Sequence, residues 1–228
     1  MDCIILGIET GGDNCSVALS KGEEIIALKE SEGREHSRYL SVFIDDVFKC
    51  SGLSYRDIDA VAVSKGPGSY TGLRIGVATA KGICYGTDRP LIAVNSLLSL
   101  ASVCNDTLTP VSPQLIYCPM IDARRLEVYT ALFDLSLKQL SDTEAMIISE
   151  NSFAEILSAR PICFFGSGAN KCKEIIKSPN AVFADIESSA SGLVRPAVEA
   201  FINRQFENTA YFEPFYLKNF VVTERKKM

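Results

Sequence analysis

Histidine is almost absent from this sequence, and the common metal-binding and catalytic patterns are missing with it. The one histidine among 228 residues is His36, which argues against a histidine-rich metal site and against a Ser-His-Asp or Cys-His catalytic arrangement. None of the eight cysteines belongs to a Cys-x-x-Cys pair, so a zinc site is not predicted. The cysteines are expected to be small buried side chains in a reducing compartment, and we make this prediction for Cys3, Cys15, Cys84 and Cys163.

Long apolar runs and an excess of positive charge are also missing. No stretch approaches the ~18 apolar residues of a membrane-spanning helix, and the opening MDCIILGIET does not have the pattern of a signal peptide. The net charge is −5, which does not favour an extensive nucleic-acid surface on the chain itself. We therefore expect a cytoplasmic globular protein with no membrane contact.

A glycine-rich unit stands near the middle of the first half. A buried strand is predicted at Ile58–Val63, a glycine turn at Gly66–Gly68, and then a helix to about Tyr85 that would end at Gly86. A second apolar strand follows at Leu91–Val94. A strand, a helix and another strand in this order are typical of a parallel crossover.

The helix of this unit has small residues at every fourth position. Gly72, Gly76, Ala80 and Cys84 share one face, although each glycine costs up to ~1 kcal/mol of helix stability relative to alanine. Two such glycines indicate that another backbone comes very close. Two interpretations are open: the stripe packs inside the chain's own fold, or it receives a helix of a second chain.

The same order of elements is predicted twice along the chain. Three strands, a helix, a strand, a helix, a strand and a helix occupy residues 3–103, and the order recurs after a proline-containing stretch at 105–113. The pattern predicts an α/β protein with a duplicated ribonuclease-H-like fold of two βββαβαβα lobes, as in actin, sugar kinases and Hsp70. The predicted domains are 1–104 and 105–228. Either the helix at 191–203 or the tail at 213–228 is expected to pack back on the first lobe.

The turn after the first strand has two interpretations. Thr10, Gly11, Gly12 and Asp13 lie where an actin-like fold places its phosphate loop, and backbone N–H groups in such a turn can bind phosphate. A cation would then be needed between the phosphate and the acidic side chains of Glu9 and Asp13. The turn is therefore either purely structural or a vestigial nucleotide loop.

Two segments resemble a known family. The stretch SKGPGSYTGLRIGVATA (Ser64–Ala80) is similar to the signature of the bacterial TsaB (YeaZ) family, and ILGIETGGDNCSVAL resembles the first hairpin of that family. The family usually has aspartate where Glu9 stands and Ser-Thr where Gly11 and Gly12 stand. The resemblance extends over nearly the whole chain and is best in the first half.

The resemblance implies a role in forming N6-threonylcarbamoyladenosine in tRNAs that read ANN codons. The chain would be a non-catalytic partner and activator of the transferase TsaD, which uses threonylcarbamoyl-adenylate from a TsaC-type enzyme. It would form a heterodimer with a TsaD-like chain, and a TsaE-like ATPase would join them. It would reach tRNA only through this complex. Because the proposed helix surface is self-complementary, a homodimer is possible when the chain is alone. The altered Glu9–Gly12 run predicts that no cofactor is bound tightly, with ATP or ADP possible only at the complex junction.

One departure from TsaD separates the two families. TsaD carries an Asn-His-x-x-x-His pattern whose histidines bind metal, whereas this chain has Asn95 followed by Ser96 and Leu100 at those positions. Leucine cannot ligate a metal, and a serine hydroxyl is a poor substitute for imidazole. We therefore expect no metal and no catalytic residue, and the same argument counts against a metallopeptidase.

The resemblance places the partner contact, or the dimer contact, on the first two helices of the chain. The residues proposed for this interface are His36, Tyr39, Leu40, Phe43, Tyr70, Leu73, Arg74, Gly76, Val77 and Ala80. For His36, a capping or interface role is favoured over catalysis. The alternative function is an ATP-dependent small-molecule kinase or ATPase of the actin-like group, which would turn over ATP by itself and depend on Asp13.

Overall fold

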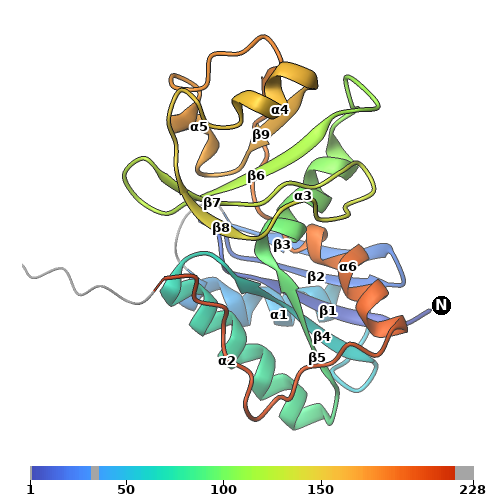
Figure 1. Ribbon diagram of the computed structural model, residues 1–228. Coiled ribbons are helices and arrows are strands. Elements are labelled where there is room, and N and C mark those ends of the chain that lie inside the picture. Colours follow the sequence, from blue (N-terminus) through green and yellow to red (C-terminus); the bar gives the residue numbers. More distant parts are fainter. Residues whose placement is uncertain (1, 32–35, 219–228) are drawn as a thin grey trace, which may run out of the picture.

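The computed structural model describes residues 2–31 and 36–218, which form two lobes (Figure 1). The elements of the first half are β1 (Ile4–Glu9), β2 (Ser16–Lys21), β3 (Glu24–Glu30), α1 (His36–Ser51), β4 (Ala60–Gly66), α2 (Tyr70–Thr87), β5 (Leu91–Asn95) and α3 (Ser96–Thr107). Those of the second half are β6 (Ile116–Asp122), β7 (Glu127–Thr130), β8 (Glu144–Ile147), α4 (Ala154–Ala159), β9 (Ile162–Phe165), α5 (Ala169–Cys172), β10 (Ala181–Phe183) and α6 (Ser191–Ile202).

The two sheets have the same strand order. The first sheet runs β3-β2-β1-β4-β5, and the second runs β8-β7-β6-β9-β10. In each, the first three strands form an antiparallel meander, and the last two add in parallel beside the first. The predicted duplication of a ribonuclease-H-like unit is therefore confirmed, because order and direction both repeat.

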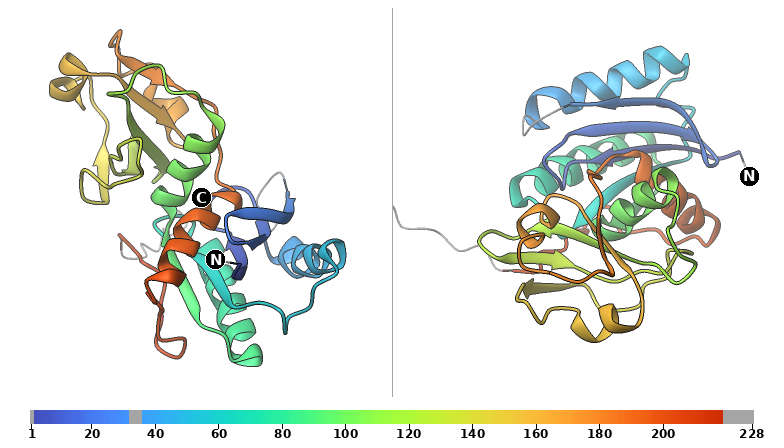
Figure 2. Two further views of the ribbon diagram at one scale, coloured as in Figure 1. Left: turned by 90° about the vertical axis from the view of Figure 1, so that its right-hand side faces the viewer. Right: turned by 90° about the horizontal axis from the view of Figure 1, so that it is seen from above.

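The first sheet is covered on both faces. Helices α1 and α2 pack on one face, where Leu40, Ile44 and Val77 meet Leu6 and Val61. The other face is covered by α6, the last helix of the described chain, which contacts β1, β4 and β5 (Figure 2). The C-terminal helix thus packs back on the first lobe, one of the two arrangements expected from the sequence.

The last helix of each half packs on the sheet of the other half. Helix α3 follows the first sheet in sequence, yet Leu97, Leu100 and Cys104 pack against Tyr117 and Phe165 of the second sheet. Helices α3 and α6 also pack on each other where the lobes meet (Figure 2). Packing therefore crosses the predicted boundary at residues 104 and 105, and the division into domains stays a prediction.

Two predicted helix ends are wrong. Helix α2 continues past Gly86 to Thr87 and is capped by Asp88, whose φ of 54° puts it in the left-handed conformation that asparagine and aspartate also adopt at helix ends. The sequence pattern also predicts a helix at Ala169–Lys177 after the glycine turn at Gly166–Gly168, and the observed helix α5 ends at Cys172. Pro179 disfavours helical backbone in the residue before it, which limits extension toward that position. No helix in the described ranges is long and apolar enough to cross a membrane.

Seven of the eight cysteines are buried and Cys50 alone is exposed, with all eight thiols free. Burial of the four predicted thiols is thus confirmed, and burial raises the pKa of Cys15 and of Cys84 to about 11. We predict that a thiol reagent labels one cysteine per native chain rapidly, because thiolate and access are both needed. Cys50→Ser should remove that rapid phase. Rapid labelling of a second thiol in native buffer would contradict the burial seen here.

Candidate functional site

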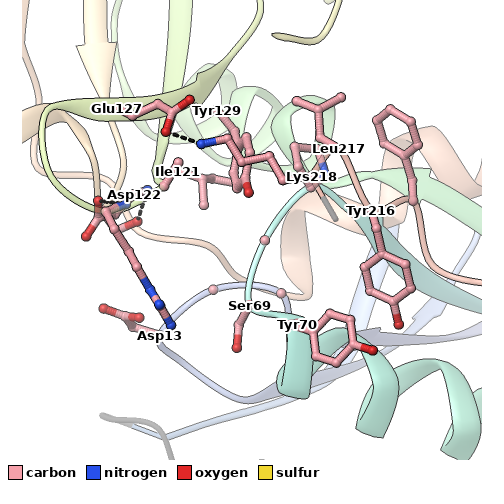
Figure 3. A pocket seen from close by; sticks show the side chains of 18 of the residues that line it. Asp13, Ser69, Tyr70, Ile121, Asp122, Glu127, Tyr129, Tyr216, Leu217 and Lys218 are labelled. Carbon is pink, nitrogen blue, oxygen red and sulfur yellow. Dashed lines mark hydrogen bonds and ion pairs between the residues drawn. The ribbon is translucent and has the colours of Figure 1, made fainter. Parts of the chain in front are cut away.

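A cleft of about 590 Å³ opens between the two lobes (Figure 3). Its floor and walls come from loops that leave the carboxyl ends of strands: Gly11–Asp13 after β1, residues 67–71 before and at the start of α2, and Asp122–Arg125 after β6. Open α/β sheets commonly bind ligands at this end of their strands. The predicted loop at Thr10–Asp13 therefore contributes to this cleft, with Thr10 buried beneath it.

Glu9 lies buried beside this loop at the end of β1. Its side chain is 1% exposed, and Oε1 accepts hydrogen bonds from the backbone N–H of Gly11 at 2.6 Å and from Oγ of Ser64 at 2.8 Å. The other oxygen, Oε2, has no partner. Burial is the main reason that the pKa of Glu9 is raised to about 7, and these hydrogen bonds lower it in part. The carboxyl group therefore takes up a backbone donor that a phosphate would need.

The raised pKa predicts a pH-dependent stability. A carboxyl group that ionises near pH 4.5 when unfolded and near 7 when folded binds its proton more tightly in the folded state. Its contribution is fully present below pH 4.5 and is lost as the pH rises through 7, a loss of about 3 kcal/mol. Glu9→Gln should remove this dependence, and the exposed control Glu150→Gln should keep it. Urea unfolding from pH 4.5 to 8 measures both, and equal slopes in Glu9→Gln and wild type would contradict the prediction.

The start of α2 is fixed against the same loop. Ser69 caps the helix, since its side chain accepts from the N–H of Gly72, and its own N–H donates to the carbonyl of Gly11 at 2.8 Å. Gly66 has φ of 111°, a conformation that favours glycine. A Cβ at Gly68 would lie 2.4 Å from the carbonyl oxygen of Gly11. The glycines of the signature therefore allow two loops of one chain to touch.

The small-residue stripe of α2 is used inside the chain, so its assignment to a partner contact is wrong. A Cβ added to Gly72 would lie 2.0 Å from the carbonyl oxygen of Thr10, and one at Gly76 would lie 2.2 Å from Oγ1 of Thr10. Thr10 also donates a hydrogen bond from that hydroxyl to the carbonyl of Gly72. The close approach serves the loop after β1. Five of the residues proposed for the partner contact are buried within this chain: Leu40, Leu73, Gly76, Val77 and Ala80.

The other face of α2 is open. Arg74, Ala78, Gly82 and Tyr85 are exposed and lie on the side opposite the stripe, and Tyr85 is 90% exposed. We call these four residues the outer face of α2. Sequence reasoning selected Arg74 and missed the other three, although their helical spacing marks them as soon as the buried face is known.

The remaining proposed contact residues are only partly accessible. Tyr39 and Phe43 stack on α1 with ring centroids 5.4 Å apart, and both are half-buried. Tyr70 is half-buried at the start of α2, where the guanidinium of Arg74 lies over its ring. The side chain of His36 lies outside the described part of the structure. Whether these residues contact a partner stays a prediction.

The two positions that hold metal ligands in TsaD have structural roles here. Oγ of Ser96 accepts a hydrogen bond from the N–H of Gly66 at 3.1 Å, and Leu100 is 1% exposed in the core between α3 and the second sheet. Within residues 2–31 and 36–218 there is no group of three or more His, Cys, Asp or Glu side chains placed to hold a metal ion.

The tail also enters the cleft, which sequence reasoning did not anticipate. Phe215, Tyr216, Leu217 and Lys218 line it (Figure 3). The apolar residues of the tail sequence predict a tail packed by Phe215, Tyr216, Leu217 and Phe220. Phe220 lies outside the described residues. The tail has no clear periodicity, so its path could not be read from the sequence.

Comparison with known proteins finds similarity to both the TsaD and the TsaB families. A family model described as TsaD, tRNA N6-adenosine threonylcarbamoyltransferase, matches residues 28–219. The tRNA N6-adenosine threonylcarbamoyltransferase of Bacillus subtilis is 34% identical over 113 residues, which are 42% of this chain and 33% of that protein. The transferase family model thus covers most of this chain, whereas the match to this transferase covers a third of that protein's length.

Similarity to a second group extends over the full chain. The tRNA threonylcarbamoyladenosine biosynthesis protein TsaB of Escherichia coli is 30% identical over 231 residues, covering 97% of both chains. The structure of YeaZ from Pseudomonas aeruginosa superposes with a TM-score of 0.80 at 24% identity, covering 94% of this chain and 100% of that one. A glucomannokinase from Arthrobacter, at 10% identity and a TM-score of 0.50, shares the fold alone. The chain belongs to the TsaB (YeaZ) family.

Proposed function

We propose that this chain is a non-catalytic subunit that binds and activates a TsaD-like transferase during formation of N6-threonylcarbamoyladenosine in tRNA. One observation carries the proposal. A chain of the TsaB family, related to the transferases, has Ser96 and Leu100 where the transferase has metal-binding histidines, and both side chains are committed to packing and hydrogen bonding. Losing the ligands while keeping the fold favours a partner over an enzyme.

The partner surface that we propose is the outer face of α2 together with the accessible side of α1. The exposed positions Ala78 and Gly82 are small and would let a partner helix approach closely, which increases dispersion contacts. A surface of this kind is self-complementary about a two-fold axis, so the isolated chain would form a homodimer that the transferase replaces. A TsaE-like ATPase would join the heterodimer, and tRNA would contact the assembled complex. We place this complex in the cytoplasm.

The cleft supports a limited role for nucleotide. The N–H of Gly11 donates to the Glu9 carboxyl group and the carbonyl of Gly11 accepts from Ser69, so both backbone groups of Gly11 are already engaged. We propose that the isolated chain holds no nucleotide tightly and that ATP or ADP binds only at the junction with the transferase. The fold likeness to a sugar kinase does not carry that activity to this chain.

The proposal is tested by recovering the chain from its own cell. A tagged copy should bring down a TsaD-like chain in near-equal amount, and exposed charge introduced on α2 should prevent this. Recovery of the tagged chain without the TsaD-like chain, or with no more of it than of an unrelated protein, would contradict the partnership.

The kinase alternative predicts the opposite behaviour of the isolated chain. We expect titration calorimetry with ATP and Mg²⁺ to show no binding at micromolar affinity, because the N–H of Gly11 is already bonded to the carboxyl group of Glu9. We also expect no ATP turnover above that of a buffer blank. Tight binding, or turnover that Asp13→Ala abolishes, would favour a kinase or ATPase.

A further inference from the structure

The segment after α6 follows the first lobe from one end to the other. Glu207 forms an isolated bridge with Leu91 on β5, the edge strand of the first sheet. Further along, Nζ of Lys81 on α2 donates to the carbonyls of Ala210 at 3.1 Å and Phe212 at 3.0 Å. The ring of Phe212 packs against the first core. Residues 207–218, which we call the strap, therefore lie along the edge of the sheet and beside α2 (Figure 1).

The strap then crosses the mouth of the cleft. The N–H of Phe215 donates to the carbonyl of Lys65 at 2.7 Å, and its carbonyl oxygen would lie 2.6 Å from a Cβ added to Gly66. This glycine thus makes room for the strap as well as for the turn. The ring of Tyr216 packs on that of Tyr70, with centroids 4.8 Å apart. All of these contacts are with the first lobe.

The last described residue of the strap contacts the other lobe. Nζ of Lys218 forms an ion pair with Oε2 of Glu127 on β7 (Figure 3). The Glu127 side chain is 22% exposed, and Nζ of Lys171 donates to its backbone carbonyl at 2.7 Å. Lys171 also pairs with Asp122. The Lys218–Glu127 ion pair therefore joins the strap to a charged cluster that is already fixed to the second sheet.

We infer that the strap is an intramolecular clasp that holds the two lobes at their present opening, with the Lys218–Glu127 pair as its releasable end. The strap is anchored along the first lobe and reaches the second across the open side of the cleft, opposite the packed helices α3 and α6. A pair at partly exposed positions contributes little to overall stability and is screened by salt. It can therefore open without unfolding either lobe, and opening it lets the two lobes move apart.

The test measures the separation of the lobes by electron spin resonance. One spin label is placed on the exposed Cys50 of α1 and a second on a cysteine replacing the exposed Ile147 of β8; the other cysteines are buried and remain unlabelled. Lys218→Glu should shift the distance distribution to longer values and broaden it. A chain ending at Phe212 should show the same change. Circular dichroism should show that both variants stay folded.

Matched variants separate the clasp from a general charge effect. Lys218→Glu combined with Glu127→Lys restores an opposite pair and should restore the wild-type distribution. Lys177→Glu removes another exposed pair, with Glu174, away from the cleft, and should change nothing. An unchanged distance distribution in both Lys218→Glu and the shortened chain would overturn the proposal that the strap holds the lobes at their present opening. Failure of the double variant to restore the distribution would overturn the assignment of the clasp to this pair. Both results are independent of any transferase.

Discussion

Gly72→Ala is expected to lower the free energy of unfolding by about 2 kcal/mol, a large effect for a single added methyl group. The added methyl group would lie 2.0 Å from the carbonyl oxygen of Thr10, and because this is backbone rather than a rotatable side chain, α2 or the loop after β1 must move. Overpacking of this kind costs ~1–3 kcal/mol and sometimes more. The gain in helix propensity, up to ~1 kcal/mol, offsets only part of it. Urea unfolding followed by circular dichroism measures the change.

The same helix supplies the matched control. Gly82 has no atom within 4 Å of an added Cβ and is exposed, so Gly82→Ala should stabilise the chain by up to ~1 kcal/mol through helix propensity alone. Gly76→Arg should unfold the chain, because its side chain would be directed at Thr10. If Gly72→Ala and Gly82→Ala had equal stability, the packing of the stripe against Thr10 would be wrong.

Ala78→Glu is expected to abolish pairing while leaving the chain folded. Ala78 is exposed on the outer face of α2, so the monomer has room for the longer side chain. In a close helix contact the new carboxylate would be buried without a partner, at a cost of about 3–5 kcal/mol. Affinity for the transferase, and for a second copy of this chain, should fall by more than about 100-fold. Analytical ultracentrifugation measures both associations.

The control for this prediction lies in the second lobe. Ala154→Glu introduces the same charge at an exposed position of α4 and should leave both associations unchanged. Normal pairing by a folded Ala78→Glu variant would show that the outer face of α2 is not the contact surface. An unfolded Ala78→Glu variant would show that the exposure of this position is wrong.

The sequence pattern alone was enough to predict the order of strands and helices, but not which segment packs against the small-residue stripe of α2. Repeated spacing of apolar runs and turns predicts the order of elements, because sheet and helix periodicities are local properties. The glycines at 72 and 76 indicate close approach, yet the approaching atoms belong to Thr10, some sixty residues earlier. Spacing within a helix carries no information about which distant segment fills the space, so both interpretations were open until the fold was known.

The buried state of Glu9 shows the same limit for the site. The sequence places an acid at the end of β1, but the raised pKa depends on packing that excludes water from it. The strap is a further case, since its residues are fixed by backbone hydrogen bonds and ring contacts with β4 and α2 rather than by a periodic pattern of their own. Tertiary contacts of this kind leave little local signal.

The most direct test of a non-catalytic, required subunit is reconstituted tRNA modification. The transferase, the TsaE-like ATPase, threonylcarbamoyl-adenylate and tRNA are combined with and without this chain, and modified adenosine is measured over many turnovers. We predict sustained modification only when the chain is present, no modification when the chain replaces the transferase, and loss of the stimulation with Ala78→Glu but not with Ala154→Glu. Equal modification in the absence of this chain would contradict the account.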